Sequence, residues 1–178
     1  NKKIDKRIFN MLKVGDIAPS FCAANQDDVE ICSRDLAGKW IVLYFYPKDL
    51  TPGCTTQACD FTDKHSFFFF FDAVILGVSA DDTEKHRKFI DKYDLTITLL
   101  SDTSKKMCED FGVWQLKQFM GKEFMGVVRT TFIINPEGKI AAIWDKVSVR
   151  KKKSVKGEKI EILHVDEVRT KLQELQSI

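Results

Sequence analysis

Two short runs of apolar residues predict the centre of a sheet. Residues 40–46 and 73–79 are almost wholly apolar and rich in aromatic and β-branched side chains, a pattern typical of strands buried on both faces. Pro47 ends the first run, because proline has no N–H to donate to a strand ladder. Further strands are expected at 97–100, 127–134 and 139–144, the last two joined by the turn residues 135–138.

Helical patterns lie between these strands. The segment from Cys54 to about Phe69 contains no Pro or Gly, so one helix can run through it. The charged segment 83–93 follows capping residues and carries Phe89 and Ile90 on one apolar side. Helical turns are also expected at 33–38, 105–111 and 165–175, and an N-terminal β-hairpin from 21–24 and 29–31. This alternation predicts an α/β domain whose central mixed sheet is flanked by helices.

Four segments fit this pattern less well. Residues 1–10 are charged and are expected to be an extension outside a single domain at 11–178. Residues 113–128, which hold two glycines, are expected to form a loop-rich excursion. The basic residues 150–159 are expected to form a solvated loop, with contact to an anionic partner as the alternative. The five phenylalanines 67–71 either pack at a helix end under the sheet or form an exposed apolar patch for a partner.

Composition narrows the class of protein. The chain has 178 residues and a formal net charge of +2, which suits one domain of ordinary size and favours neither a nucleic-acid partner nor a membrane surface. No apolar stretch reaches the about 18 residues of a membrane-spanning helix. The N-terminal residues lack the apolar core of a signal peptide. We therefore expect a cytoplasmic protein.

The five cysteines are expected to be reduced, because an odd number without a secretion signal argues against a structural disulfide framework. Cys22 and Cys32 are interpreted as small buried hydrophobic residues, and Cys108 as a core or half-exposed one. Cys54 differs, because turn and helix-start residues put it in or beside the first turn of a helix. Unpaired backbone N–H groups and the helix dipole lower the pKa of a thiol there. Cys54 is therefore expected to be partly thiolate near neutral pH, in a site that is neither apolar nor sealed from solvent.

The spacing Pro47-x-x-x-Thr51-x-x-Cys54 resembles the active-site motif of the peroxiredoxins, P-x-x-x-T-x-x-C. The wider segment 45–59 resembles the bacterioferritin comigratory protein class, also called PrxQ. Further matches are Leu76-Gly-Val-Ser79, Phe111-Gly-Val-Trp114, Phe119-Met-Gly121, Gly126-Val-Val-Arg129-Thr-Thr-Phe132 and Pro136-Glu-Gly-Lys139. The resemblance covers about residues 11–147 and returns in the last helix. It implies a thioredoxin-like fold and a thiol-specific peroxidase of antioxidant defence and cell redox homeostasis, which reduces hydrogen peroxide and organic hydroperoxides without metal, haem or flavin.

The residues before Cys54 suit this chemistry. A thiolate attacks one peroxide oxygen while the other leaves with developing negative charge. The Thr51 hydroxyl can hydrogen-bond the thiolate or the peroxide, and backbone N–H groups around Gly53 can hold the oxygens. By resemblance, Arg129 supplies a fixed cation with several donors, and Pro47 shields the sulfur. One departure is Gln57, which stands where many relatives carry Glu.

By resemblance, Cys59 is the resolving cysteine, which condenses with the sulfenic acid of Cys54 to give a disulfide. Residues five apart on a helix have Cα atoms about 8–9 Å apart, whereas a disulfide tolerates about 7 Å at most. The helix is therefore expected to unwind locally before the bond forms. The resemblance implies thioredoxin as the reductant that recycles the enzyme, and we expect a monomer or weak homodimer.

Other functions are weighed against this one. A metal site built from Cys54, Cys59 and His65 lacks a usual spacing and an evident fourth ligand. A thioredoxin-like reductase would need a C-x-x-C pair. Cys108 is the alternative resolving residue. The alternative class is a non-enzymatic binding or holdase module that uses the phenylalanine run and the basic segment 150–159. All three histidines, at 65, 86 and 164, are interpreted as surface or helix-end residues.

Overall fold

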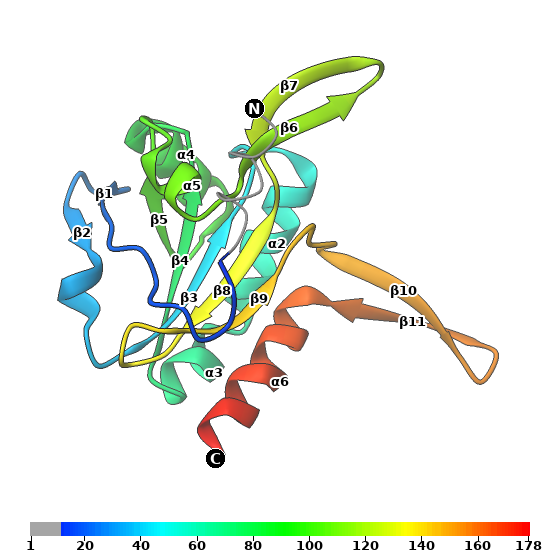
Figure 1. The fold of residues 1–178 in the computed structure, drawn as a ribbon. Helices are drawn as coiled ribbons and strands as arrows, with labels where there is room; N and C mark the ends of the chain where they lie inside the picture. Colours follow the sequence, from blue (N-terminus) through cyan, green and yellow to red (C-terminus); the bar gives the residue numbers. More distant parts are fainter. Residues whose placement is uncertain (1–11) are drawn as a thin grey trace, which may run out of the picture.

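The computed structural model describes residues 12–178, and the expected extension at 1–10 lies outside these residues. A seven-stranded mixed sheet forms its centre, in the order β2-β1-β5-β4-β3-β8-β9 (Figure 1). β3, β4 and β5 run parallel, and the other neighbours pair antiparallel. The strands are β1 (Cys22–Asn25), β2 (Glu30–Cys32), β3 (Trp40–Phe45), β4 (Ala73–Ser79), β5 (Thr98–Ser101), β8 (Thr130–Ile134) and β9 (Ile140–Trp144).

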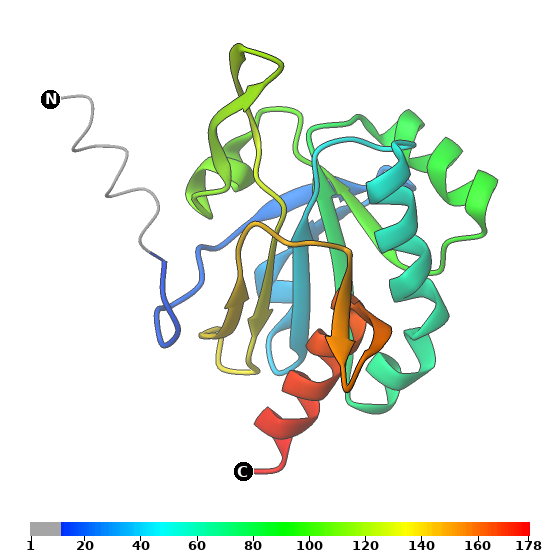
Figure 2. The ribbon, with the colours of Figure 1, turned by 90° about the vertical axis from the view of Figure 1, so that its right-hand side faces the viewer.

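Helices cover both faces of this sheet, as Figure 2 shows. The alternation of side chains along β3 separates two cores. Val42 and Tyr44 pack with residues of α2, α3, α4 and α6, whereas Ile41 and Leu43 pack with residues of α5 on the other face. The α/β prediction, with helices on either side of a mixed sheet, is confirmed. The helices are η1 (Ser33–Leu36), α2 (Pro52–Asp63), α3 (His65–Phe70), α4 (Thr83–Tyr93), α5 (Lys106–Asp110) and α6 (His164–Gln176).

The helix expected from Cys54 to Phe69 is broken at Lys64 into α2 and α3. The break lets Phe68 enter the core against Phe61, with ring centroids 5.8 Å apart. Phe69 and Phe70 are 78% and 81% exposed. The phenylalanine run therefore meets both interpretations in part, since one ring anchors α3 and two neighbouring rings face solvent.

Two segments interpreted as loops are β-hairpins, so those predictions are wrong. Residues 113–128 contain β6 (Trp114–Phe119) and β7 (Lys122–Val127), and the basic segment lies in β10 (Arg150–Val155) and β11 (Glu158–Leu163). Each hairpin turns through two residues with positive φ, Met120 and Gly121 in one and Lys156 and Gly157 in the other. Two such residues are what a tight hairpin turn requires. Both hairpins project from the central sheet (Figure 1), and β10 is exposed along its whole length.

Within residues 12–178, no helix is both long and apolar enough to cross a membrane.

Candidate active site

Cys54 is the third residue of α2, which confirms the expected position in a first helical turn. Thr51 is the N-cap residue, with extended backbone angles, and Pro52 opens the helix, where a missing N–H costs nothing. Cys54 is only 2% exposed, although Pro52 and Gly53 beside it are exposed. The expectation of a sulfur open to solvent is therefore wrong in this conformation, since the sulfur lies just beneath the surface.

Arg129, between β7 and β8, reaches this sulfur. Its Nη2 donates to Cys54 Sγ at 3.3 Å, and its Nη1 donates to Gln57 Oε1 at 2.5 Å. Gln57 is buried one turn further along α2, so the guanidinium is fixed in orientation as well as charge. A Cβ added at Gly53 would lie 3.3 Å from Nη2, which explains why a residue without a side chain suits that position. A charged donor at this distance stabilises negative charge on the sulfur.

The other two motif residues shape the loop before α2. The Thr51 hydroxyl donates to the carbonyl oxygen of Lys48 at 2.8 Å, so its own oxygen remains able to accept a hydrogen bond. Pro47 is exposed and follows the end of β3. Its shielding of the sulfur stays a prediction.

A buried polar network anchors this loop, and sequence reasoning missed it. Asp49 is 1% exposed and accepts a hydrogen bond from the Tyr46 hydroxyl at 2.5 Å. Its second oxygen faces Nδ1 of His86, whose Nε2 contacts the carbonyl oxygen of Leu100 at 3.0 Å. A carbonyl oxygen only accepts, so Nε2 donates, and a proton between Nδ1 and the carboxylate completes the link. Leu50, next in the loop, has a φ of +66°, and the anchored network helps to hold that unfavourable conformation.

The interpretation of the histidines as surface or helix-end residues is wrong for His86, which is buried within α4, whereas His164 does begin a helix, α6, and is buried there. His86 and His164 are 0% and 2% exposed. His86 falls on the apolar stripe of α4 with Phe89, a spacing that could have revealed its burial. Nε2 of His164 lies 2.8 Å from the Thr131 hydroxyl, and burial, followed by nearby positive charges, lowers the pKa of His164 to about 4.

Two further polar groups lie near the sulfur. Burial raises the pKa of the Tyr44 hydroxyl well above its ordinary value, with Cys54 as the next largest cause. This hydroxyl has no hydrogen-bond partner among the described residues, and its ring fills the space beside Gly77, where a Cβ would lie 2.7 Å from it. Burial, followed by Arg129, lowers the pKa of Lys117 in β6. Cys54 thus has cations and a phenol near it, and it also packs among the apolar residues of the core that includes Ala58 and Phe61.

The candidate resolving cysteines differ in their surroundings. Cys59 is a half-buried free thiol in the same continuous helix as Cys54. Burial, followed by Asp63 and Asp60, raises the pKa of its thiol. Cys108 is also free but buried, and desolvation raises the pKa of its thiol further.

Cys22 and Cys32 form a disulfide, so the interpretation of both as buried reduced cysteines is wrong. The odd number of cysteines was a poor guide, because two cysteines can pair whenever they face each other across a hairpin. Cys22 and Cys32 are direct partners in the register of β1 and β2. Among the described residues, the grouping of Cys, His and acidic side chains close enough to hold a metal is Cys22, Glu30 and Cys32. This grouping contains none of the three residues weighed as a metal site from the sequence, Cys54, Cys59 and His65.

Comparisons with known proteins agree with this geometry. Residues 14–143 match the model of the AhpC/TSA family. Peroxiredoxin Bcp of Bacillus subtilis is 49% identical over 78% of this chain and 88% of its own length, and Peroxiredoxin Bcp of Escherichia coli is 44% identical over 76% and 87%. The bacterioferritin comigratory protein of Xanthomonas campestris superposes with a TM-score of 0.77 at 33% identity, over 93% of this chain and 98% of that one. The chain belongs to the AhpC/TSA family, and within it to the Bcp or PrxQ peroxiredoxins, which are cysteine-based peroxidases with a thioredoxin-like fold.

Proposed function

We propose that this protein reduces hydrogen peroxide and organic hydroperoxides with Cys54 as the peroxidatic residue and Cys59 as the resolving residue. The observation that carries the proposal is the contact of 3.3 Å between Arg129 Nη2 and Cys54 Sγ at the N-terminus of α2. A solved relative from Xanthomonas campestris is described by its alkyl peroxide reduction activity, which supports the inclusion of organic hydroperoxides.

In the first step, the Cys54 thiolate attacks one oxygen of the peroxide and the O–O bond breaks. The sulfur becomes a sulfenic acid, and the other oxygen takes a proton and leaves as water or an alcohol. The guanidinium of Arg129 stabilises the negative charge on the sulfur and then on the leaving oxygen. The Thr51 oxygen, whose hydrogen is donated to Lys48, accepts a hydrogen bond from the O–H group of the bound peroxide. Since Cys54 is 2% exposed, a small movement of the surrounding side chains must admit the substrate.

In the second step, the Cys59 thiol displaces water from the sulfenic acid and forms the Cys54–Cys59 disulfide. Both cysteines lie in one continuous helix, so the first turns of α2 must open for the sulfurs to meet. A thioredoxin-type dithiol then attacks the disulfide, becomes oxidised itself and restores both thiols. We propose that the folded unit at 11–178 works in this way in the cytoplasm, as a monomer or weak homodimer.

The test is peroxide consumption coupled to thioredoxin, thioredoxin reductase and NADPH, together with mass spectrometry of the chain after one equivalent of peroxide. We expect Cys54→Ser to abolish peroxide consumption. We expect Cys59→Ser to react once and to stop at the sulfenic acid. If Cys59→Ser turns over like the wild type while Cys108→Ser does not, the assignment of the resolving residue is wrong. A chain that consumes no peroxide with any dithiol reductant contradicts the proposal as a whole.

A further inference from the structure

The β1–β2 hairpin carries a second pair of sulfurs, separated from the peroxidatic site by the sheet. Cys22 and Cys32 are directly opposite each other in antiparallel register, with Cα atoms 4.0 Å apart. In the sheet order, β5 and β4 lie between β1 and β3, the strand that leads to Cys54. The pair is therefore a site of its own and takes no part in the steps proposed for Cys54.

The hairpin has other interactions that hold it without the disulfide. The Asn25 side chain accepts hydrogen bonds from the N–H groups of Asp27 and Val29, which closes the turn. The disulfide links residues only 10 apart, and a short loop gives a disulfide less chain entropy to remove than a long loop does. The strands can therefore stay paired when the disulfide is reduced, so that the sulfurs remain in register for re-oxidation.

The two sulfurs differ in access. Cys22 is exposed, whereas Cys32 is 2% exposed. Both line a surface pocket of about 580 Å³, together with the charged side chains of Arg34, Asp102 and Lys106. A thiolate attacks a disulfide along the sulfur–sulfur direction at the sulfur it can reach. Cys22 is thus the attacked sulfur, and Cys32 is the leaving group.

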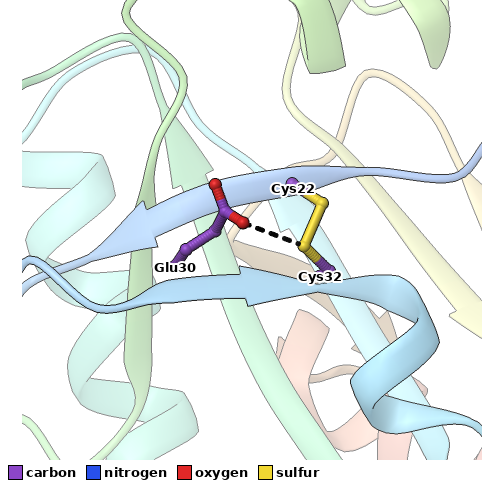
Figure 3. Close-up of side chains that lie close together, drawn as sticks. All are labelled: Cys22, Glu30 and Cys32. Carbon is purple, nitrogen blue, oxygen red and sulfur yellow. Dashed lines mark hydrogen bonds between the residues drawn. A yellow bond between two sulfur atoms is a disulfide. The ribbon is translucent and has the colours of Figure 1, made fainter.

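Glu30 makes the reduced form more favourable. Its Oε1 lies 3.5 Å from Cys32 Sγ, on the same side of the hairpin as the disulfide (Figure 3). A disulfide sulfur has no hydrogen to donate, so this contact becomes a hydrogen bond only when Cys32 is a thiol. The carboxylate also disfavours a thiolate beside it, so the leaving sulfur takes up a proton. The hydrogen bond, which only the thiol form can make, favours the dithiol over the disulfide.

We propose that Cys22 and Cys32 form a second thiol–disulfide exchange site, reduced by a dithiol and independent of the peroxidatic cysteine. One thiolate of the reductant attacks Cys22 Sγ, the S–S bond breaks, and Cys32 leaves with the electron pair and takes a proton. The second thiol of the reductant then attacks the mixed disulfide and releases Cys22, so that two electrons and two protons pass to the pair. Hydroperoxide reverses this: its O–O bond breaks, one oxygen oxidises one thiol to a sulfenic acid and the other leaves as water or an alcohol, and the second thiol then displaces water to re-form the disulfide.

The wild-type chain allows a direct test. Both cysteines fall in one tryptic peptide, 14–34, which contains none of the other cysteines. The folded protein is equilibrated with mixtures of reduced and oxidised dithiothreitol, alkylated and digested, and the dithiol fraction of this peptide is measured by mass spectrometry. We expect a graded titration with a midpoint inside the range of the buffer, and recovery of the disulfide on addition of peroxide. The rate of peroxide turnover by Cys22→Ser is expected to stay within about twofold of the wild-type rate, which is the range expected of surface substitutions.

Glu30→Gln tests the role assigned to the carboxylate. A neutral acceptor forms a hydrogen bond about half as strong as a charged one does. The disulfide should therefore be harder to reduce, and the ratio of reduced to oxidised dithiothreitol at the midpoint should rise about threefold. Asp27→Asn, an equal loss of charge in the same hairpin, should leave the midpoint unchanged.

Three outcomes overturn the proposal. The peptide stays a disulfide until the protein unfolds, which makes the bond structural. It stays a dithiol at every ratio and after peroxide, which means that no redox couple exists. The reduced pair binds one Zn²⁺ per chain and then resists oxidation, which makes Cys22, Glu30 and Cys32 a metal site.

Discussion

Replacing Arg129 by methionine removes the guanidinium that contacts the peroxidatic sulfur and keeps most of the side-chain volume. The substitution breaks two contacts, the one to Cys54 Sγ at 3.3 Å and the one to Gln57 Oε1 at 2.5 Å. Arg129→Lys keeps the charge but not the two-pronged geometry. Comparison of the two variants therefore separates charge from orientation.

The expected loss of rate follows from the distance between the Arg129 guanidinium and the Cys54 sulfur. Two unit charges 3.3 Å apart attract by about 5 kcal/mol at an effective dielectric of about 20. Arg129 is half-buried, and solvent reduces this attraction to about 3 kcal/mol, a value similar to the measured loss of one donor from an oxyanion site. At about 1.4 kcal/mol for each factor of ten, Arg129→Met should slow the reaction with peroxide about 100-fold. The rate of Arg129→Lys should fall between the rates of Arg129→Met and the wild type.

The measurement is the second-order rate constant of the reduced enzyme with hydrogen peroxide, followed in a single turnover so that resolution and recycling do not contribute. Lys122→Met is the matched control, because it removes an equal charge from an exposed position on β7. It should change the rate constant less than twofold, within the range expected of surface substitutions. Urea unfolding of each variant shows whether the fold is intact.

A fall of less than about threefold in Arg129→Met, with the fold intact, would refute the reasoning, since it corresponds to less than about 1 kcal/mol of charge stabilisation. A fall of the same size in Lys122→Met would also refute it, because the effect would then arise from net charge and not from the contact with sulfur.

Three further outcomes are expected. The pKa of His164 falls from 6.5 in the unfolded chain to about 4 in the folded protein, so the free energy of unfolding decreases as the pH falls through this window. The loss reaches about 3 kcal/mol, at about 1.36 kcal/mol per pKa unit. Urea unfolding of His164→Gln should lack this pH-dependent loss. Asp63→Asn should lower the raised pKa of Cys59, seen as faster alkylation of Cys59 at pH 8 when the other reduced cysteines are serine. Arg150→Gln breaks the two hydrogen bonds to Asp60 beside Cys59 and should speed formation of the Cys54–Cys59 disulfide several-fold in quenched reactions; an unchanged rate would mean that this ion pair does not restrain α2.

The central strands and the position of Cys54 could be predicted from the sequence because their signals are local. Residues 73–79 form β4 with the predicted bounds, and 83–93 form α4 with the predicted bounds. Such segments bury a complete face, so apolar periodicity reports them directly. β10 exposes every residue and β7 exposes the first four of its six. Neither strand therefore carries a periodic apolar face, and only the positive-φ turn residues mark the hairpins.

Pairs of residues far apart in sequence needed the folded sheet. Cys22 and Cys32 meet because of strand register, and Asp49 and His86 meet because α4 packs over the start of the active-site loop. Each residue alone looked ordinary, since a single cysteine or histidine has no local pattern that names its partner.

Arg129 illustrates how topology completes the site. It lies 75 residues after Cys54, and only the family resemblance joined the two in the sequence. In the fold, β3 and β8 are antiparallel neighbours, and Phe45 at the end of β3 pairs with Thr130 at the start of β8. The residue before Thr130 therefore lies at the edge of the sheet where β3 gives way to the loop that carries Cys54. Any sequence that keeps this register delivers the residue before β8 to the N-terminus of α2, so the register of two strands determines which cation meets the sulfur.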